Sequence, residues 1–149
     1  MAKDEKGLIQ RWVDGARAKA EVAIRAKFEP GEELLEWTGG QTSPPEFFGF
    51  IPGLSLYHKL KTRHWITALT NRRLLLLRHS ASSLGKILET RAIPLARVRG
   101  MRMKRGVLFV ALVVDAPGGP WTFKEMEREI TEKFIARFKE AKSAAAGGS

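Results

Sequence analysis

The sequence predicts a mainly β fold with a helix at each end. We expect a seven-stranded, strongly bent antiparallel sandwich or partial barrel, capped by the C-terminal helix and extended by an N-terminal one. Apolar residues recur at three- and four-residue steps near both ends of the chain. The middle instead shows period-two alternation and short apolar runs, which Gly and Pro interrupt roughly every eight to twelve residues. A terminal amphipathic helix is then needed to cover the open end of the barrel.

The N-terminal segment 5–28 has the spacing of an amphipathic helix. Glu29-Pro30-Gly31 should end it, since a residue before proline is displaced from the α region. The apolar stripe is rich in alanine and buries little area, so the helix needs a partner, either the domain itself or another chain. The stripe consists of Ile9, Val13, Ala16, Ala20, Ile24 and Phe28.

Seven short strands are expected between the helices. Gly39-Gly40 should stop the first strand, and Asn71-Arg72 and Lys104-Arg105-Gly106 are expected to form turns. Segment 41–62 contains too many Pro and Gly residues for a regular element. Val107–Val114 is the most hydrophobic strand and is expected at the centre of the sheet. The expected strands are Leu34–Thr38, Arg63–Thr70, Leu74–Arg78, Ile87–Ile93, Val98–Met103, Val107–Val114 and Trp121–Phe123.

The chain is expected to become helical again over residues 125–142. Met126, Ile130, Phe134 and Phe138 follow one another at four-residue steps and predict one apolar face. The chain length of 149 residues fits one domain. We therefore predict an N-terminal amphipathic helix over 1–30, a domain over 31–142 and a flexible tail over 143–149.

Four motifs occur in a characteristic order. Gly31-Glu32-Glu33-Leu34-Leu35 comes first, Thr70-Asn71-Arg72-Arg73-Leu74 follows within an apolar hairpin, and the segments 92–98 and 121–138 close the series. Over residues 31–140 this order resembles bacterial PH-like and GRAM-like domains, which belong to the pleckstrin-homology superfold. The resemblance implies a binding module, because such domains bind lipids, peptides or one another on the same scaffold.

The charge distribution indicates a polyanionic partner. The formal net charge is +10. Between Phe47 and Val114 there are thirteen Lys or Arg residues and a single acid, Glu89, whereas the flanking segments are nearly balanced. A basic centre of this kind suits an anionic membrane, a nucleic acid or an acidic protein. The alternative is that these residues only solvate the outer faces of strands.

The loop between the first two expected strands is the leading candidate for membrane contact. Aromatic and aliphatic side chains there precede alternating cations, and alternating residues of an extended chain point to the same side. Rings enter a bilayer interface while Lys and Arg attract anionic lipid. The other interpretations are that the apolar residues fold back onto the domain or fill a protein groove. The membrane- or partner-contacting candidates are Phe47, Phe48, Phe50, Ile51 and Tyr57, and the cationic ones are Lys59, Lys61 and Arg63.

A second basic cluster is expected near the fifth and sixth strands. It comprises Arg97, Arg99, Arg102, Lys104 and Arg105, and the last four are the candidates for binding an anionic surface. These residues can bind an anionic surface, or they can protect a strand edge from aggregation. At the earlier hairpin turn, Arg72 and Arg73 are more consistent with a structural role, in which the arginine stem packs on the sandwich edge.

Several function classes lack sequence support. The chain has no cysteine, and its three histidines lack the spacing of a metal site, so we expect no metal and no cofactor. No nucleophile or phosphate-loop motif occurs, which argues against an enzyme. The RNP1-like stretch 105–112 has Val107 and Leu112 in place of base-stacking aromatics and keeps only Phe109, which disfavours nucleic acid. No segment has the apolar length of a signal peptide or membrane span, and we expect a cytoplasmic protein.

The leading hypothesis is therefore a non-catalytic module that docks on the anionic inner face of the membrane. The alternative is a protein-interaction or self-assembly module without a lipid ligand, in which the partner is another protein or a second copy of the chain. Salt should distinguish the two, because charge-driven docking is screened whereas an apolar interface is not.

Overall fold

The computed structural model describes residues 2–42, 63–80 and 83–147. Within them, the helices are α1 (Ala2–Arg25), the short 3-10 helix η2 (Leu95–Arg97) and α3 (Arg128–Gly147). The strands are β1 (Leu34–Thr42), β2 (Arg63–Thr70), β3 (Arg73–Ser80), β4 (Ser83–Pro94), β5 (Gly100–Arg105), β6 (Val110–Asp115) and β7 (Trp121–Met126).

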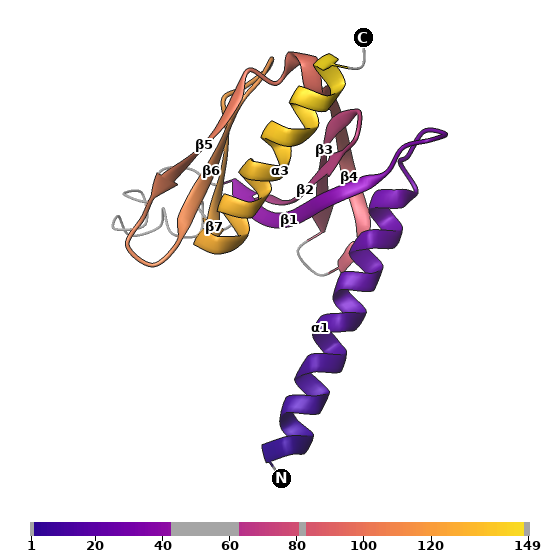
Figure 1. Ribbon diagram of the computed structural model, residues 1–149. Coiled ribbons are helices and arrows are strands. Elements are labelled where there is room, and N and C mark those ends of the chain that lie inside the picture. Colours follow the sequence, from indigo (N-terminus) through magenta and orange to yellow (C-terminus); the bar gives the residue numbers. More distant parts are fainter. Residues whose placement is uncertain (1, 43–62, 81–82, 148–149) are drawn as a thin grey trace.

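The seven strands form one antiparallel sheet in the order β4-β3-β2-β1-β7-β6-β5. The junction between β1 and β7 is short and is made through the pairing of Gln41 with Lys124. The sheet therefore has a β1–β4 half and a β5–β7 half, and Figure 1 shows α3 lying between them. This architecture confirms the predicted fold class: mainly β, seven strands, a C-terminal helix against the sheet and an additional N-terminal helix.

The main core fills the space between the two halves and α3. Side chains from both halves of the sheet meet Phe134 and Phe138 of α3 there. Alternation along each strand selects the contributing residues, because successive side chains point to opposite faces. The fully buried members from the strands include Leu69, Leu74, Leu76, Leu112, Val114 and Phe123.

A second apolar layer lies on the opposite face of the β1–β4 half. The C-terminal part of α1 packs there, through the completely buried Ala20 and Ile24. Their partners are Ile66, Ala68, Leu75 and Leu77 of β2 and β3. Since β3 is buried on both faces, its sequence is a continuous apolar run, Leu74–Leu77, rather than an alternating one. In β2 the buried apolar residues are interrupted by the buried Thr67. The start of α1 extends away from the sheet (Figure 1).

The first strand continues through Gly39 and Gly40 to Thr42, so the prediction that these glycines stop it was wrong. Gly40 has no side chain, and this allows the strand to pass close to Phe123 of β7. A Cβ at that position would lie 2.9 Å from Cβ of Phe123, a distance that forces a shift. The two halves of the sheet approach each other closely at this point, and glycine permits it.

The hydrophobic stretch that begins at Val107 is shorter as a strand than predicted, and it is not central. β6 starts only at Val110, and it lies between β7 and the edge strand β5. Residues 106–109 form the turn of the β5–β6 hairpin instead. Three large apolar residues that we expected in a strand are therefore exposed.

The C-terminal helix begins at Arg128 and continues through residues 143–147, which were predicted to belong to a flexible tail. Its buried face comprises Thr131, Phe134, Phe138 and Ala141. Ile130 is 43% exposed, and Met126 belongs to β7, so the predicted four-residue stripe was only partly right. The boundaries 1–30, 31–142 and 143–149 stay a prediction for the division into domains.

Candidate functional site

The tip of the β5–β6 hairpin, residues 106–109, exposes an unusual amount of apolar surface. Val107 is fully exposed, Leu108 is 87% exposed and Phe109 is 50% exposed. Gly106 makes this tight turn, because a Cβ there would lie 2.2 Å from the backbone oxygen of Phe109. We call residues 106–109 the hairpin tip. Contiguous exposed apolar residues of this kind mark an interaction site more often than single ones do.

Cationic side chains lie next to the hairpin tip. Lys104 and Arg105 end β5 directly before it. Arg102 and Lys104 share one face of β5, since they are two residues apart, and Arg105 alternates to the other face. Lys104 is paired with Ala111 of β6, and Arg102 with Val113. The apolar tip thus has positive charge on both sides of the hairpin.

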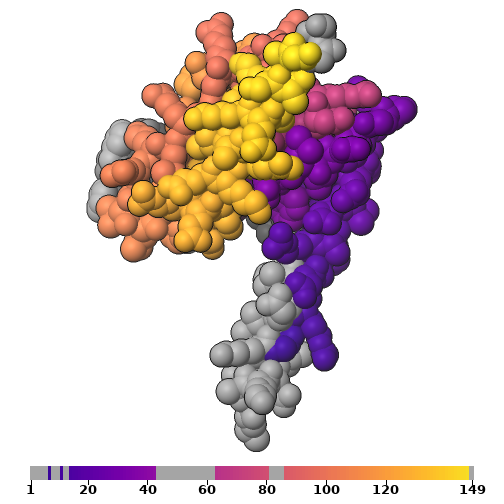
Figure 2. Space-filling view, viewed as in Figure 1, coloured from indigo at the N-terminus to yellow at the C-terminus, as the bar shows by residue number. Residues whose placement is uncertain are grey.

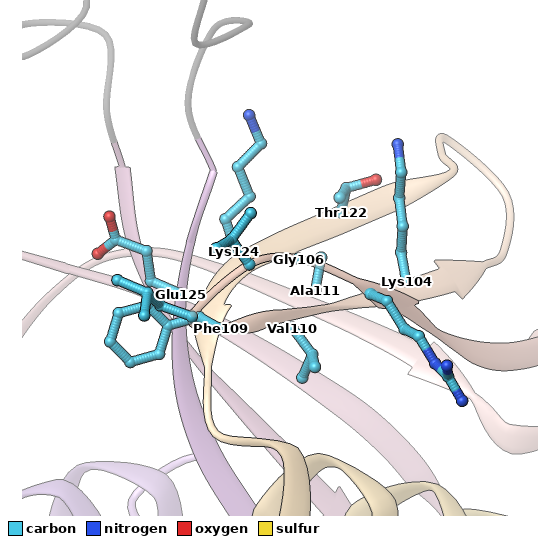
Figure 3. Close-up of a pocket in the computed structure, with 11 residues that line it drawn as sticks. Lys104, Gly106, Phe109, Val110, Ala111, Thr122, Lys124 and Glu125 are labelled. Atoms are coloured by element: carbon cyan, nitrogen blue, oxygen red, sulfur yellow. The ribbon is translucent and has the colours of Figure 1, made fainter.

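The neighbouring strand β7 adds to the same face. Val113 pairs with Thr122, and Lys124 lies opposite the stretch of β6 that contains Ala111. Figure 3 shows Lys104, Lys124 and Thr122 extending to one side of the sheet. We call Arg102, Lys104, Thr122 and Lys124 the cationic face. Within the part of the chain that the structure describes, its three cations make no ion pair or side-chain hydrogen bond.

A β-bulge separates the only nearby acid on β7 from these cations. The pairing of β6 with β7 shifts between Val110 and Leu112, which places one extra residue on β7. Glu125 adopts the left-handed conformation there, with φ of 58°. The bulge turns Met126 into the core and leaves Glu125 exposed, whereas regular alternation would point Glu125 inward. In Figure 3 the Glu125 side chain extends away from the two lysines.

An open hollow of about 580 Å³ lies beside these groups. It is lined by residues 104–111 together with Thr122, Lys124 and Glu125. The hollow therefore joins the hairpin tip to the cationic face. Such an arrangement can bind an anion next to an apolar surface.

At the β2–β3 hairpin, the side chain of Arg73 is held by hydrogen bonds, unlike the cations beside the hairpin tip. Arg73 donates from Nε to Oε2 of Glu32 over 2.9 Å and from Nη2 to Oε1 over 2.9 Å. It also donates to the backbone oxygen of Lys27, and the Thr70 hydroxyl donates to Oε2 of Glu32 over 2.6 Å. These contacts tie the segment after α1 to the hairpin, which agrees with a structural role for Arg73.

The environment of Glu32 keeps it ionised. Burial alone would raise the pKa of this carboxyl group, whose side chain is fully buried. Hydrogen bonds from Arg73, Thr70 and the backbone NH of Glu29, together with the charge of Arg73, outweigh burial and lower the pKa to about 2. The hydrogen bonds that Arg73 donates to Glu32, together with the charges of Glu32 and Glu29, raise the pKa of Arg73 against its own burial.

The candidate residues of the first loop are mostly outside the described residues. Phe47, Phe48, Phe50, Ile51, Tyr57, Lys59 and Lys61 all fall in the segment 43–62, and their roles stay predictions. Arg63 is described and begins β2, where it pairs with Thr42 of β1.

The residues of the second predicted basic cluster do not all lie together in the structure. Arg99 precedes β5, and its backbone NH donates to the backbone oxygen of Asp115 over 2.7 Å. Since a strand rises about 3.3 Å per residue, Arg99 and Arg105 lie near opposite ends of β5, roughly 20 Å apart. Arg102, Lys104 and Arg105 remain together near the tip. The sequence did not identify five residues of this site: Val107, Leu108, Phe109, Thr122 and Lys124. The turn sequence Lys104-Arg105-Gly106 directly before three apolar residues was the signal that could have identified the tip.

Two kinds of feature are absent from the described residues. No group of three or more His, Cys, Asp or Glu side chains in this part of the chain could hold a metal ion. None of the helices described has the length and apolar character needed to cross a bilayer.

Among solved structures, the chain is similar to the hSac2 domain from the human phosphoinositide phosphatase Sac2. The TM-score is 0.58 with 8% sequence identity, and the match covers 94% of this chain and 84% of that domain. No family model and no curated protein matches the sequence.

This neighbour corrects the family assignment made from the motifs. It is an hSac2 domain and not a PH-like or GRAM-like domain, so the assignment of residues 31–140 was wrong. The motif Thr70-Asn71-Arg72-Arg73-Leu74 has a structural explanation, because Thr70 and Arg73 both donate hydrogen bonds to the buried Glu32. A motif fixed by such a contact identifies a hairpin rather than a family. At 8% identity, the comparison establishes a shared fold.

Proposed function

We propose that this chain is a non-catalytic binding module that docks on an anionic membrane surface through the hairpin tip. The observation that carries the proposal is the exposure of Val107, Leu108 and Phe109 in one turn, directly after Lys104 and Arg105. Large apolar side chains next to cations are the combination that peripheral membrane contacts use.

The apolar part would supply the larger share of the binding free energy. Removing a Val, Leu or Phe side chain from water is worth about 1.5–3 kcal/mol each. Leu108, at 87% exposure, has almost all of that contribution still available. Inserting the tip alone would therefore give weak but measurable binding.

The cations would supply attraction and selectivity for anionic lipid. Each Lys or Arg near an anionic surface contributes about 1 kcal/mol, and this contribution decreases with salt. Within the described residues, Lys104 and Arg105 make no ion pair that this contact would have to break. The predicted residues Phe47, Phe48, Lys59 and Lys61 would extend the surface if they lie beside the tip.

The similar structure suggests which lipid to include in a test. It comes from a phosphoinositide phosphatase, and phosphoinositides are anionic lipids. The likeness concerns the fold, so a phosphoinositide is one composition among those compared.

Co-sedimentation with vesicles tests the proposal. The vesicles would consist of phosphatidylcholine alone, of phosphatidylcholine with phosphatidylglycerol, and of phosphatidylcholine with a phosphoinositide, at low and high salt. We expect binding to both anionic compositions, weaker binding at high salt, and at least about tenfold weaker binding for Leu108→Asp. The matched control is Leu88→Asp, the same change at an exposed leucine of β4, which should bind like the wild type.

Equal binding by the wild type and Leu108→Asp would exclude the tip as the docking element. Binding to no vesicle would contradict the proposal as a whole. The alternative, a protein-interaction or self-assembly module, has one observation in its favour: the start of α1 extends away from the rest of the molecule (Figure 1). Concentration-dependent association that resists salt would support that alternative.

A further inference from the structure

We propose that the cationic face binds the terminal phosphate of a lipid phosphomonoester, with Lys104 and Lys124 on either side of it. This inference rests on the proposed membrane docking and names the lipid chemistry that would be recognised. It differs from general attraction to anionic lipid, because it requires a defined site on the outer face of β5, β6 and β7.

The strand register places the two lysines in one row across the sheet. Lys104 pairs with Ala111, and the bulged part of β7 that contains Lys124 lies on the other side of Ala111. Neighbouring strands are about 4.8 Å apart, so the two lysine backbones are roughly 10 Å apart. Two extended lysine side chains at that separation can bring their ammonium groups to one phosphate.

The next row along the strands adds a third cation and a hydroxyl group. Arg102 pairs with Val113, and Val113 pairs with Thr122. Guanidinium and hydroxyl groups both donate hydrogen bonds to phosphate oxygens. A phosphomonoester suits this set better than a phosphodiester, since it carries up to two negative charges and three terminal oxygens.

The middle strand leaves room for the ligand. Between Lys104 and Lys124, β6 presents only Ala111, which is small, uncharged and partly exposed, whereas Val113 in the next row is buried. Glu125 of β7 also lines the hollow, and after the bulge its side chain extends away from the lysines (Figure 3). The hollow of about 580 Å³ beside Lys104 and Lys124 is large enough for a headgroup.

The site also lies at a suitable depth for a membrane lipid. Ala111 is three residues from Leu108, so the two are at most about 10 Å apart along the hairpin, because Leu108 and Phe109 belong to the turn. Apolar side chains of peripheral proteins enter the boundary between headgroups and acyl chains by about 5–10 Å. With Leu108 inserted to that depth, the lysine row would be level with the lipid phosphates.

The first test uses vesicles of equal surface charge that contain either phosphatidic acid, a phosphomonoester, or phosphatidylglycerol, a phosphodiester. We expect the wild type to bind phosphatidic acid vesicles at least about fivefold more tightly. The double variant Lys104→Gln/Lys124→Gln should lose this preference. The control Lys86→Gln/Lys139→Gln removes the same charge from exposed lysines of β4 and α3 and should keep the preference. Equal binding of both lipids by the wild type would overturn the site while leaving membrane docking intact.

The second test separates the site from docking by using soluble dihexanoyl phosphatidic acid and amide NMR spectra. Shifts at Ala111 and Val113 are expected in the wild type, and they should be lost in Lys104→Gln/Lys124→Gln. Such shifts without vesicle binding would retain the site and contradict the proposed docking. Absence of shifts, or the same affinity for inorganic phosphate as for the lipid, would overturn the inference.

Discussion

The β2–β3 and β5–β6 hairpins each have arginine or lysine at the turn, but the contacts of these side chains differ. At the first hairpin, the Arg73 side chain is held by two hydrogen bonds to the buried Glu32. At the second, Lys104 and Arg105 are exposed and make no ion pair within the described residues, and the turn beside them exposes apolar residues.

The difference shows that the role of basic residues at a turn depends on the groups that they contact in the folded protein. A buried carboxylate turns Arg73 into part of the scaffold. Other arginines of the β1–β4 half are also satisfied: Arg78 and Arg91 both pair with Glu89. Within the described residues, Arg102, Lys104, Arg105 and Lys124 of the β5–β7 half make no ion pair, and we therefore propose that the binding function lies there.

The largest expected effect concerns the scaffold arginine. Arg73→Met keeps the apolar stem and leaves Glu32 as an uncompensated buried charge. Breaking one side of such a pair costs about 3–5 kcal/mol of the free energy of unfolding. Urea denaturation followed by circular dichroism would measure it. A loss below about 1 kcal/mol would contradict the structural role of Arg73.

The same substitution at the other hairpin is the control. Arg105→Met should change the free energy of unfolding by no more than about 0.5 kcal/mol, since Arg105 is exposed and away from the core. It should instead weaken binding to anionic vesicles about fivefold, which corresponds to one cation. Equal stability losses for the two variants would remove the contrast between the hairpins.

A smaller effect should appear as pH dependence of stability. The pKa of Glu32 is lowered to about 2 in the folded protein, so its ionised form is favoured by folding. The resulting stabilisation is fully present above the ordinary pKa of 4.5 and is lost as pH falls toward 2. The expected loss is on the order of 3 kcal/mol.

Urea denaturation between pH 6 and pH 2, compared with the variant Glu32→Gln, would measure this contribution. Glu32→Gln should be less stable at pH 6 and should lack the part of the acid dependence that Glu32 supplies. An identical acid dependence in the two proteins would show that Glu32 has an ordinary pKa in the fold.

Much of the fold could be predicted from local patterns. The β2–β3 hairpin was predictable because its two apolar runs flank a short polar turn, and β2 was predicted with its observed bounds, Arg63–Thr70. The termination at Gly39-Gly40 was wrong because Gly40 is required by Phe123, a residue distant in sequence. No local pattern reveals such a contact.

The candidate site was harder to predict, for a physical reason. Val107, Leu108 and Phe109 are the residue types of a buried strand, and hydrophobicity alone assigns them to the core. Their exposure follows from the tight turn at Gly106 and from the position of β5 at the sheet edge. Lys124 joins Lys104 only through the register of three strands, which the sequence does not specify.

The measurement that tests the central claim most directly compares the two hairpins on a membrane. The chain has no cysteine, so Leu108→Cys and Arg72→Cys each create one site for an environment-sensitive fluorophore. With anionic vesicles, we expect a blue shift and quenching by lipid-embedded quenchers for the label at position 108, and no change at position 72. Equal responses at both positions, or a response at position 72 alone, would contradict the account.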